Sequence, residues 1–218
     1  MTYKPEERLS KYEFWEDCYV KEIENFSNNE EDIGEVWFGE SIAEEVVERI
    51  TEFATPEMKI LDVGCGNGYT LSLLANEGYT HLYGMDYSPS SIVLTRKILE
   101  RNEVDMTTVV LEEMDMLKDD CLDHSQIQVM DIVIDKGTFD AIMVADDQKE
   151  RAAKYKKVLN QWLSNGGYFI ITSCNWTESE LVNWLGEGLV IEDRIADGMF
   201  SFGGSTGSKT TTIFFKTI

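Results

Sequence analysis

The stretch ILDVGCGNG, residues 60–68, decides the fold. A short apolar run ends in an acid and leads directly into glycines at every second position. The apolar run is typical of a buried strand, and the glycines let the backbone turn sharply and approach a ligand closely. A helix is expected to begin near Tyr69. This strand, glycine loop and helix indicate the ligand-binding turn of a doubly wound α/β fold.

The same alternation continues along the chain. Helices are expected to begin near Tyr69, Pro89 and Lys149, and Asn165-Gly166-Gly167 is expected to stop the last of them. The predicted strands are MKILDV (58–63), HLYGMD (81–86), TTVVLE (107–112), VMDIVID (129–135), YFIITS (168–173), GLVIEDRI (188–195) and KTTTIFFKTI (209–218). We therefore predict an α/β fold with a Rossmann-like, doubly wound, seven-stranded and mostly parallel sheet that ends in an antiparallel hairpin.

Two helices are predicted before the sheet. One covers residues 12–26, and the second covers residues 41–53 with Ser41 as its cap and Glu44 three positions later. The chain of 218 residues fits one domain. We divide that domain into an N-terminal helical cap on the substrate side (1–57) and a cofactor-binding core (58–218).

Composition limits the possible functions. The net charge of −22 repels a phosphate backbone, so nucleic acid is excluded as the expected substrate. Residues 1–50 hold five basic and fifteen acidic side chains, which indicates either a solvated surface or an acidic face for a basic protein partner. No long apolar run or signal-peptide core is found, so we expect no membrane association and a cytoplasmic location. The four cysteines are far apart and only two histidines occur, so no metal site is expected.

The glycine loop differs from two common nucleotide sites. A dinucleotide fingerprint would need glycine at position 69, where Tyr69 stands, and a P-loop would need a lysine after Gly68. Asp86 lies 22 residues beyond Gly64, the spacing at which an acid meets ribose hydroxyls. Asp115, between two methionines, is suited to an adenine amino group. The pocket therefore fits a nucleoside with a zwitterionic tail.

These residues resemble those of the class I, seven-stranded S-adenosylmethionine-dependent methyltransferases over about residues 58–218. The resemblance implies S-adenosylmethionine as the cofactor. The expected cofactor-binding residues are Asp62, Gly64, Cys65, Gly66, Gly68, Asp86, Tyr87, Met114, Asp115, Met116 and Asp135.

A second set of motifs narrows the resemblance. It consists of YEFWEDCY (12–19), GEVWFGE (34–40), IDKGTFDAI (134–142), ITSCNWT (171–177) and FSFGG (200–204). Together they are similar to the eukaryotic lysine methyltransferases of translation elongation factor 1-alpha. The resemblance implies a cytosolic enzyme that acts on one lysine of a folded, basic protein, and we expect a monomer.

Within this resemblance Asp135 is the candidate catalytic residue. It ends the fourth strand beside the glycine loop and is expected to orient the cofactor or the incoming lysine, although it could instead be a helix-capping acid. The expected substrate channel is lined by Trp37, Phe38, Phe139, Asn175, Trp176, Phe200 and Phe202, with core packing as the alternative for each aromatic ring.

Other readings remain open at this point. The acceptor could be another protein lysine, or a small molecule if Asp146-Asp147 serves a metal-dependent catechol-type enzyme. A non-enzymatic binding module that retained the fold is a further alternative, against which the complete set of Gly64, Asp86 and Asp115 argues.

Overall fold

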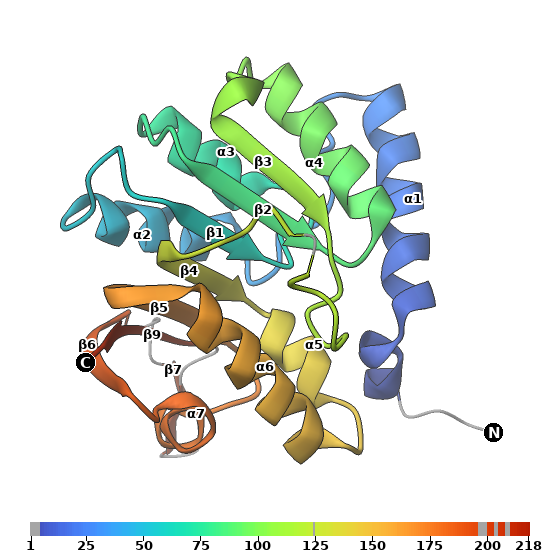
Figure 1. The fold of residues 1–218 in the computed structure, drawn as a ribbon. Coiled ribbons are helices and arrows are strands. Elements are labelled where there is room, and N and C mark those ends of the chain that lie inside the picture. The colour runs from blue at the N-terminus through green and yellow to red at the C-terminus, as the bar shows by residue number, and fades with distance from the viewer. Residues whose placement is uncertain (1–4, 124, 196–199, 203–204, 208–209) are drawn as a thin grey trace.

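A seven-stranded sheet forms the centre of the molecule in the computed structural model, which describes residues 5–123, 125–195, 200–202, 205–207 and 210–218 (Figure 1). The strand order is β3-β2-β1-β4-β5-β9-β6. Neighbours up to β5 are parallel, whereas β9 is antiparallel to both β5 and β6. The strands are β1 Ile60–Val63, β2 Leu82–Asp86, β3 Val109–Glu113, β4 Met130–Lys136, β5 Leu163–Ser173, β6 Leu189–Ile195 and β9 Thr211–Thr217. The predicted fold class, with its antiparallel C-terminal pair, is confirmed.

Helices cover both faces of this sheet (Figure 1). Side chains of α5, α6 and α7 form one core cluster with Leu61 and Val63 of β1, and α2, α3 and α4 form a second cluster with Ile60. Successive strand residues alternate between the faces, so β1 is buried on both sides and reads as one apolar run. The α-helices that follow β1 are α3 Tyr69–Asn76, α4 Pro89–Arg101, α5 Thr138–Met143, α6 Gln148–Trp162 and α7 Glu178–Leu185.

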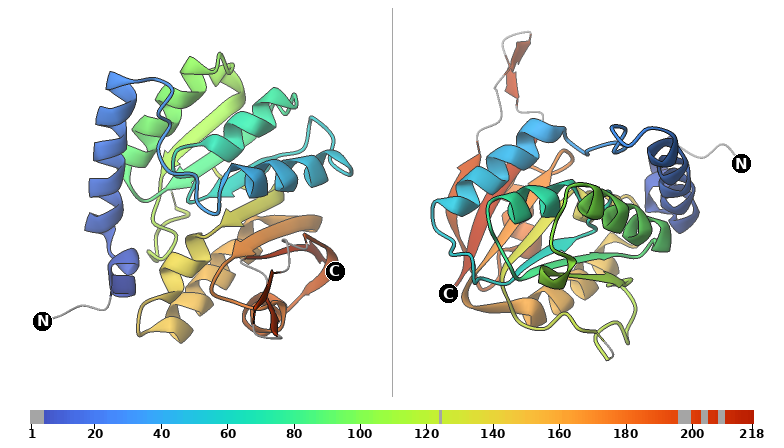
Figure 2. Two further views of the ribbon diagram at one scale, coloured as in Figure 1. Left: turned by 180° about the vertical axis from the view of Figure 1, so that it is seen from behind. Right: turned by 90° about the horizontal axis from the view of Figure 1, so that it is seen from above.

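Three helical elements precede the sheet: η1 Pro5–Ser10, α1 Tyr12–Asn28 and α2 Glu40–Thr51. Helix α1 lies along α4 (Figures 1 and 2), and Phe26 of α1 forms a small apolar cluster with Leu94 and Ile98 of α4. Helix α1 is therefore packed against a part of the chain that lies about one third of the sequence further on.

Two local predictions are wrong. Ser41 does not cap α2, because the helix begins at Glu40 after Gly39, whose φ of 88° ends the preceding turn. Asn165–Gly167 does not end α6, because that helix stops at Trp162 and β5 has already begun at Leu163. The glycines lie within β5 instead, beside a shift in its register with β4. Both errors come from turn residues whose partners were not visible in the sequence.

The segment between β6 and β9 contains a small separate ribbon. Strands β7 Phe200–Phe202 and β8 Ser205–Gly207 pair antiparallel there. A short 3-10 turn, η2 Met106–Thr108, precedes β3. Within the described residues, no helix has the length and apolar content needed to cross a membrane.

Candidate active site

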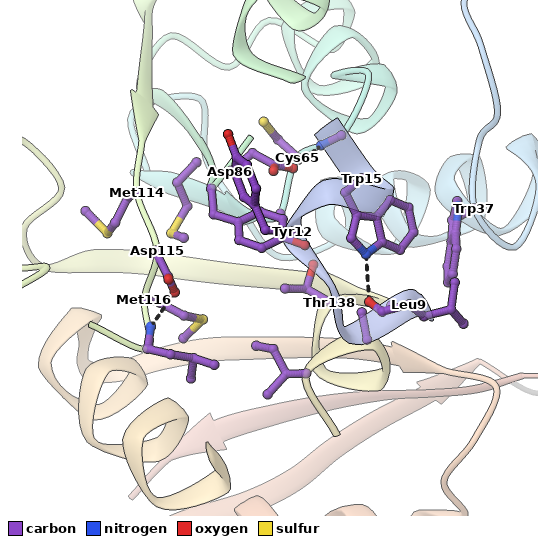
Figure 3. A pocket seen from close by; sticks show the side chains of 18 of the residues that line it. Leu9, Tyr12, Trp15, Trp37, Cys65, Asp86, Met114, Asp115, Met116 and Thr138 are labelled. Atoms are coloured by element: carbon purple, nitrogen blue, oxygen red, sulfur yellow. Dashed lines mark hydrogen bonds between the residues drawn. The ribbon is translucent and has the colours of Figure 1, made fainter. Parts of the chain in front are cut away.

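A cavity of about 610 Å³ opens at the carboxyl ends of β1, β2, β3 and β4. In a doubly wound sheet this edge is the expected ligand site, and the volume lies within the usual range for small-molecule pockets. Figure 3 shows Met114, Asp115 and Met116 at one end, Asp86 and Tyr12 in the middle, and Trp15 and Trp37 at the other end. The cavity is thus elongated, with different chemistry along its length.

The glycine loop forms the floor of the cavity. Gly64 has a φ of 67°, and a Cβ atom there would lie 2.0 Å from the hydroxyl oxygen of Thr138. That hydroxyl donates a hydrogen bond of 2.8 Å to the carbonyl of Val63. Only glycine therefore allows the loop after β1 to meet the start of α5 so closely. Both Gly64 and Gly66 line the cavity.

Helix α4 fixes the loop from its other side. The hydroxyls of Ser91 and Thr95 both donate to the carbonyl of Gly66, at 2.7 and 2.9 Å. Cys65 lines the cavity as well and is buried, and burial raises the pKa of its thiol well above the ordinary value. Gly68 does not line the cavity, because it forms the N-cap of α3 with a φ of 76°.

Asp86 occupies the middle of the cavity at the end of β2. Its carboxylate is buried and accepts hydrogen bonds from the backbone N–H groups of Gly66 (3.2 Å) and Ser88 (3.0 Å). Burial raises its pKa to about 6, against the opposing effect of these hydrogen bonds. Two carboxylate oxygens offer about four acceptor positions, so Asp86 retains capacity for a ribose diol. Tyr87, the next residue, lines the cavity beside it.

The end beyond β3 is apolar with one acid. Met114 and Met116 are buried and line the cavity, and Asp115 lies between them (Figure 3). One oxygen of Asp115 accepts from the backbone N–H of Leu117 at 3.0 Å. Its carboxylate remains a suitable acceptor for an amino group of a heterocycle held between polarisable methionine side chains.

The opposite end is aromatic. The rings of Trp15 and Trp37 lie 4.8 Å apart by centroid, and Trp37 packs over Gly137 in the turn after β4. A Cβ atom on Gly137 would lie 3.2 Å from Trp37 and 3.1 Å from the ring of Phe38. Phe38 has a φ of 65°, which is unusual for an aromatic residue and costs on the order of 1–3 kcal/mol. The strained backbone holds Trp37 against Gly137.

The structure brings together most of the predicted cofactor residues. Those that line the cavity are Gly64, Cys65, Gly66, Asp86, Tyr87, Met114, Asp115 and Met116, joined by Trp37 from the predicted substrate channel.

Asp135 and Asp62 are not among the lining residues. The carboxylate of Asp135 is fully buried, accepts from the hydroxyl of Tyr155 (2.7 Å) and from the backbone N–H of Phe139 (3.0 Å), and so holds the start of α5. Burial raises its pKa to about 7. The carboxylate of Asp135 thus points toward α6 and not into the cavity. The contact of Asp135 with the backbone N–H of Phe139 matches the alternative, an acid that caps the start of a helix.

Several predicted channel residues also lie elsewhere. Phe139 is fully buried in the core, and Trp176 packs against Phe139 and Trp184. Asn175 is exposed and does not line the cavity. Phe38 packs against Gly137 but does not line the cavity either. Phe139 and Trp176 therefore pack in the core, which is the alternative considered in the sequence analysis. The side chains of Phe200 and Phe202 lie outside the described residues.

Other residues of the cavity were not predicted as site residues. They include Leu9, Tyr12, Trp15 and Tyr19 from η1 and α1, and Lys136 from the end of β4. The spacing of Tyr12, Trp15 and Tyr19 by three and four positions marks one helical face, a signal that was available. No local pattern shows, however, that this face covers the glycine loop.

No three potential metal-ligating side chains gather within the part of the chain that the structure describes. The cysteines at positions 18, 65, 121 and 174 are free. Asp146 and Asp147 are exposed outside the cavity, and Asp147 pairs with Arg151 of the next helical turn. The cavity thus provides a diol acceptor, an amino acceptor, apolar ring contacts and an aromatic end, which fits an adenosine with an amino-acid tail.

Comparisons with known proteins agree with this geometry. Residues 54–204 match the family described as "Methyltransferase domain". The chain is 35% identical to human EEF1A lysine methyltransferase 2 over 95% of this chain and 86% of the relative. It is 33% identical to a protein-lysine N-methyltransferase of Saccharomyces cerevisiae, over 95% of this chain and 94% of the relative. The fold is similar to that of magnesium protoporphyrin IX methyltransferase from Synechocystis with bound S-adenosylmethionine, with a TM-score of 0.63, 16% identity and coverage of 93% and 97%.

Proposed function

Because this chain belongs to the family of S-adenosylmethionine-dependent protein-lysine methyltransferases, we propose that it methylates a lysine of translation elongation factor 1-alpha. The observation that carries the proposal is the match to relatives named for this reaction over nearly the whole of both chains. The match covers 95% of this chain and so reaches α1, which lines the cavity outside the sheet.

The cofactor is S-adenosylmethionine, which supplies an activated methyl group on a sulfonium centre. We assign Asp86 to its ribose hydroxyls, Asp115 to its adenine amino group and the two neighbouring methionines to the faces of the adenine ring. The backbone of Gly64 and Gly66 bounds the tail. These assignments are supported by the order of the residues along the cavity.

The acceptor lysine enters at the aromatic end. We propose that Trp15 and Trp37 enclose its aliphatic stem and attract its cationic head by cation–π contact, worth about 0.5–2 kcal/mol. A lysine with a pKa of about 10.4 must lose its proton before it can attack. Removal of the amine from water, and the positive charge that a bound sulfonium would supply, disfavour the charged form and promote loss of the proton to solvent. Alignment of the neutral amine then supplies the main catalytic contribution of the chain.

Asp135 is proposed to act as a positioning residue. Its hydrogen bonds to Tyr155 and Phe139 fix the turn Lys136-Gly137-Thr138, and all three residues of that turn line the cavity. Replacement of Asp135 is therefore expected to displace the cavity wall, without removing a group that touches the reacting atoms.

The net charge of the chain bears on the kind of partner that it binds. An acidic chain of net charge −22 favours a basic protein surface over nucleic acid. We propose a cytoplasmic monomer made of one domain. Residues 1–57 are proposed to cap the cofactor as well as to face the substrate, because Tyr12, Trp15 and Trp37 lie in the same cavity as Asp86.

The test uses the full chain, isotopically labelled S-adenosylmethionine and purified elongation factor 1-alpha. Mass spectrometry is expected to find label on one lysine of the factor. A factor in which that lysine is replaced by arginine should remain unlabelled. Asp86→Ala in the enzyme serves as the control for cofactor-dependent transfer.

Label on a different protein of a whole lysate, with none on the factor, would contradict the proposed acceptor and leave methyl transfer intact. Label on a catechol that requires magnesium would favour the small-molecule alternative. The exposed positions of Asp146 and Asp147 weigh against that alternative.

A further inference from the structure

Lys136 is a cationic residue at the tail end of the cavity. It is the last residue of β4, and Val63 pairs with Asp135 in register, so Lys136 follows at the level of Gly64. Both Lys136 and Gly64 line the cavity. Lys136 is therefore part of the ligand pocket because it lies at the carboxyl end of a parallel strand.

The ammonium of Lys136 is incompletely paired. It donates one hydrogen bond of 3.2 Å to the carbonyl of Trp37. Among the residues that the structure describes, no carboxylate oxygen lies within ion-pair distance of it. An ammonium has three donor hydrogens, so two remain for a ligand.

Two opposing influences act on the charge of Lys136, and burial is the larger. Burial lowers the pKa of Lys136, and the charges of Asp62 and Asp135 act in the opposite direction. Burial raises the pKa of Asp62 to about 6, and the neighbouring charge of Lys136 opposes that rise. A half-buried charge without a close partner is unfavourable unless a ligand completes its contacts.

The other two cationic residues around the cavity are placed differently. Lys118 is exposed and follows the Met114–Met116 end, and Arg151 is already paired with Asp147 at 2.6 Å. Lys136 is therefore the cation available at the glycine-loop end of the described cavity.

We propose that Lys136 binds the carboxylate of the methionine tail of the cofactor. The tail carries an ammonium and a carboxylate, and it lies at the end of the ligand opposite the adenine. With the adenine at Asp115, the carboxylate arrives beside Lys136. A charge-assisted hydrogen bond of this kind accounts for about a tenfold to hundredfold gain in affinity. The inference rests on the cofactor of the proposed function and is independent of the acceptor.

The test is calorimetry with two ligands. S-adenosylhomocysteine contains the amino-acid tail, and 5′-methylthioadenosine lacks it. We expect Lys136→Met to weaken binding of S-adenosylhomocysteine by about tenfold or more and to leave binding of 5′-methylthioadenosine within about twofold. Lys97→Met, at an exposed lysine of α4, is the matched control and should bind both ligands as the unmodified chain does.

Equal losses for both ligands, or an unchanged affinity for S-adenosylhomocysteine, would overturn the inference. A second measurement uses the unmodified chain and so does not depend on the variant's folding. S-adenosylhomocysteine should protect Lys136 from reductive methylation by formaldehyde, read by mass spectrometry, and 5′-methylthioadenosine should not. Equal protection by both ligands also overturns the inference. If the unmodified chain binds neither ligand, the cofactor itself is wrong, an outcome distinct from failure of the Lys136 contact.

Discussion

The two ends of the cavity are built from different kinds of structure. At the cofactor end, Gly64, Asp86 and Asp115 each lie at or just beyond the carboxyl end of a parallel strand. At the aromatic end, Trp15 comes from a helix and Trp37 from an irregular segment, and both precede the sheet. The sheet topology places the first set at one edge, whereas the second set depends on how α1 packs on α4. One half of the site is therefore determined by strand order and the other by side-chain contacts across the chain.

The largest effect is expected at the cofactor end. Asp86→Ala removes the proposed ribose acceptor and the hydrogen bonds that tie Gly66 and Ser88 together. Affinity for S-adenosylhomocysteine should fall about a hundredfold or more, measured by calorimetry. Glu113→Ala, at an exposed acid opposite Asp86 on β3, is the matched control and should change affinity little. Similar affinities for the two variants would exclude Asp86 from the ligand site.

A smaller and more selective effect is expected at the aromatic end. Trp37→Leu should lower kcat/KM for the protein acceptor about tenfold, because cation–π and packing contacts to the lysine are lost. Cofactor affinity should change less than kcat/KM. Trp176→Leu provides the control, since its ring packs on Phe139 and Trp184 away from the cavity. Trp176→Leu should reduce the thermal stability and leave kcat/KM unchanged in the folded protein. A loss of kcat/KM in Trp176→Leu with none in Trp37→Leu would contradict the assignment of Trp37 to the site and Trp176 to the core.

The contact between α1 and α4 is expected to set cofactor release. Glu16 of α1 accepts hydrogen bonds of 2.6 Å from the hydroxyls of both Ser88 and Ser90, which lie at the start of α4. Burial acts to raise the pKa of Glu16, and these hydrogen bonds outweigh it and lower the value. Glu16→Ala should increase the dissociation rate of S-adenosylhomocysteine about threefold to tenfold in stopped-flow measurements. Glu13→Ala, at an exposed acid of the same helix, should leave that rate unchanged.

The smallest effect concerns pH and the sheet itself. Burial raises the pKa of Asp62 and Asp86 to about 6 and that of Asp135 to about 7, from an ordinary value of 3.8. A carboxyl whose pKa is raised by folding stabilises the folded state while protonated, and this contribution is lost as the pH rises through the folded value. The melting temperature of the cofactor-free chain should therefore be a few degrees higher near pH 5.5 than near pH 8. Asp135→Asn should reduce this difference, and an equal or larger difference in the variant would contradict the assignment.

The predictable part of the molecule is the part governed by local pattern. The alternation of apolar runs, turn residues and helical patterns was sufficient for the fold class, and the glycine loop and the strand-end acids, with the family resemblance, led to eight cavity residues. The direction in which each strand side chain points was harder to predict from the sequence. Asp135 and Lys136 are adjacent, but alternate strand residues face opposite sides, so the acid is buried against α6 and the lysine lines the cavity.

The aromatic residues show the second limit. Trp176 follows a strand end, as a ligand-binding residue often does, but α7 covers it and makes it part of the core. Trp15 has helical spacing to Tyr12 and Tyr19, and this predicts a shared face without naming its partner. The packing partner of that face is identified by contacts between distant parts of the chain, such as the hydrogen bond between Glu16 and Ser88, 72 positions apart.

That separation also bears on how the protein is made. During synthesis Trp37 emerges 99 residues before Lys136, the side chain that donates to its carbonyl. At about 5–20 residues per second, the interval is roughly 5–20 s. Throughout it, the segment that holds Trp37 lacks the turn after β4 against which it packs, although α4, the partner of α1, emerges earlier. The cap is thus translated before every element that it contacts in the site, and a chaperone that protects the nascent chain would meet Trp15 and Trp37 before any strand of the sheet.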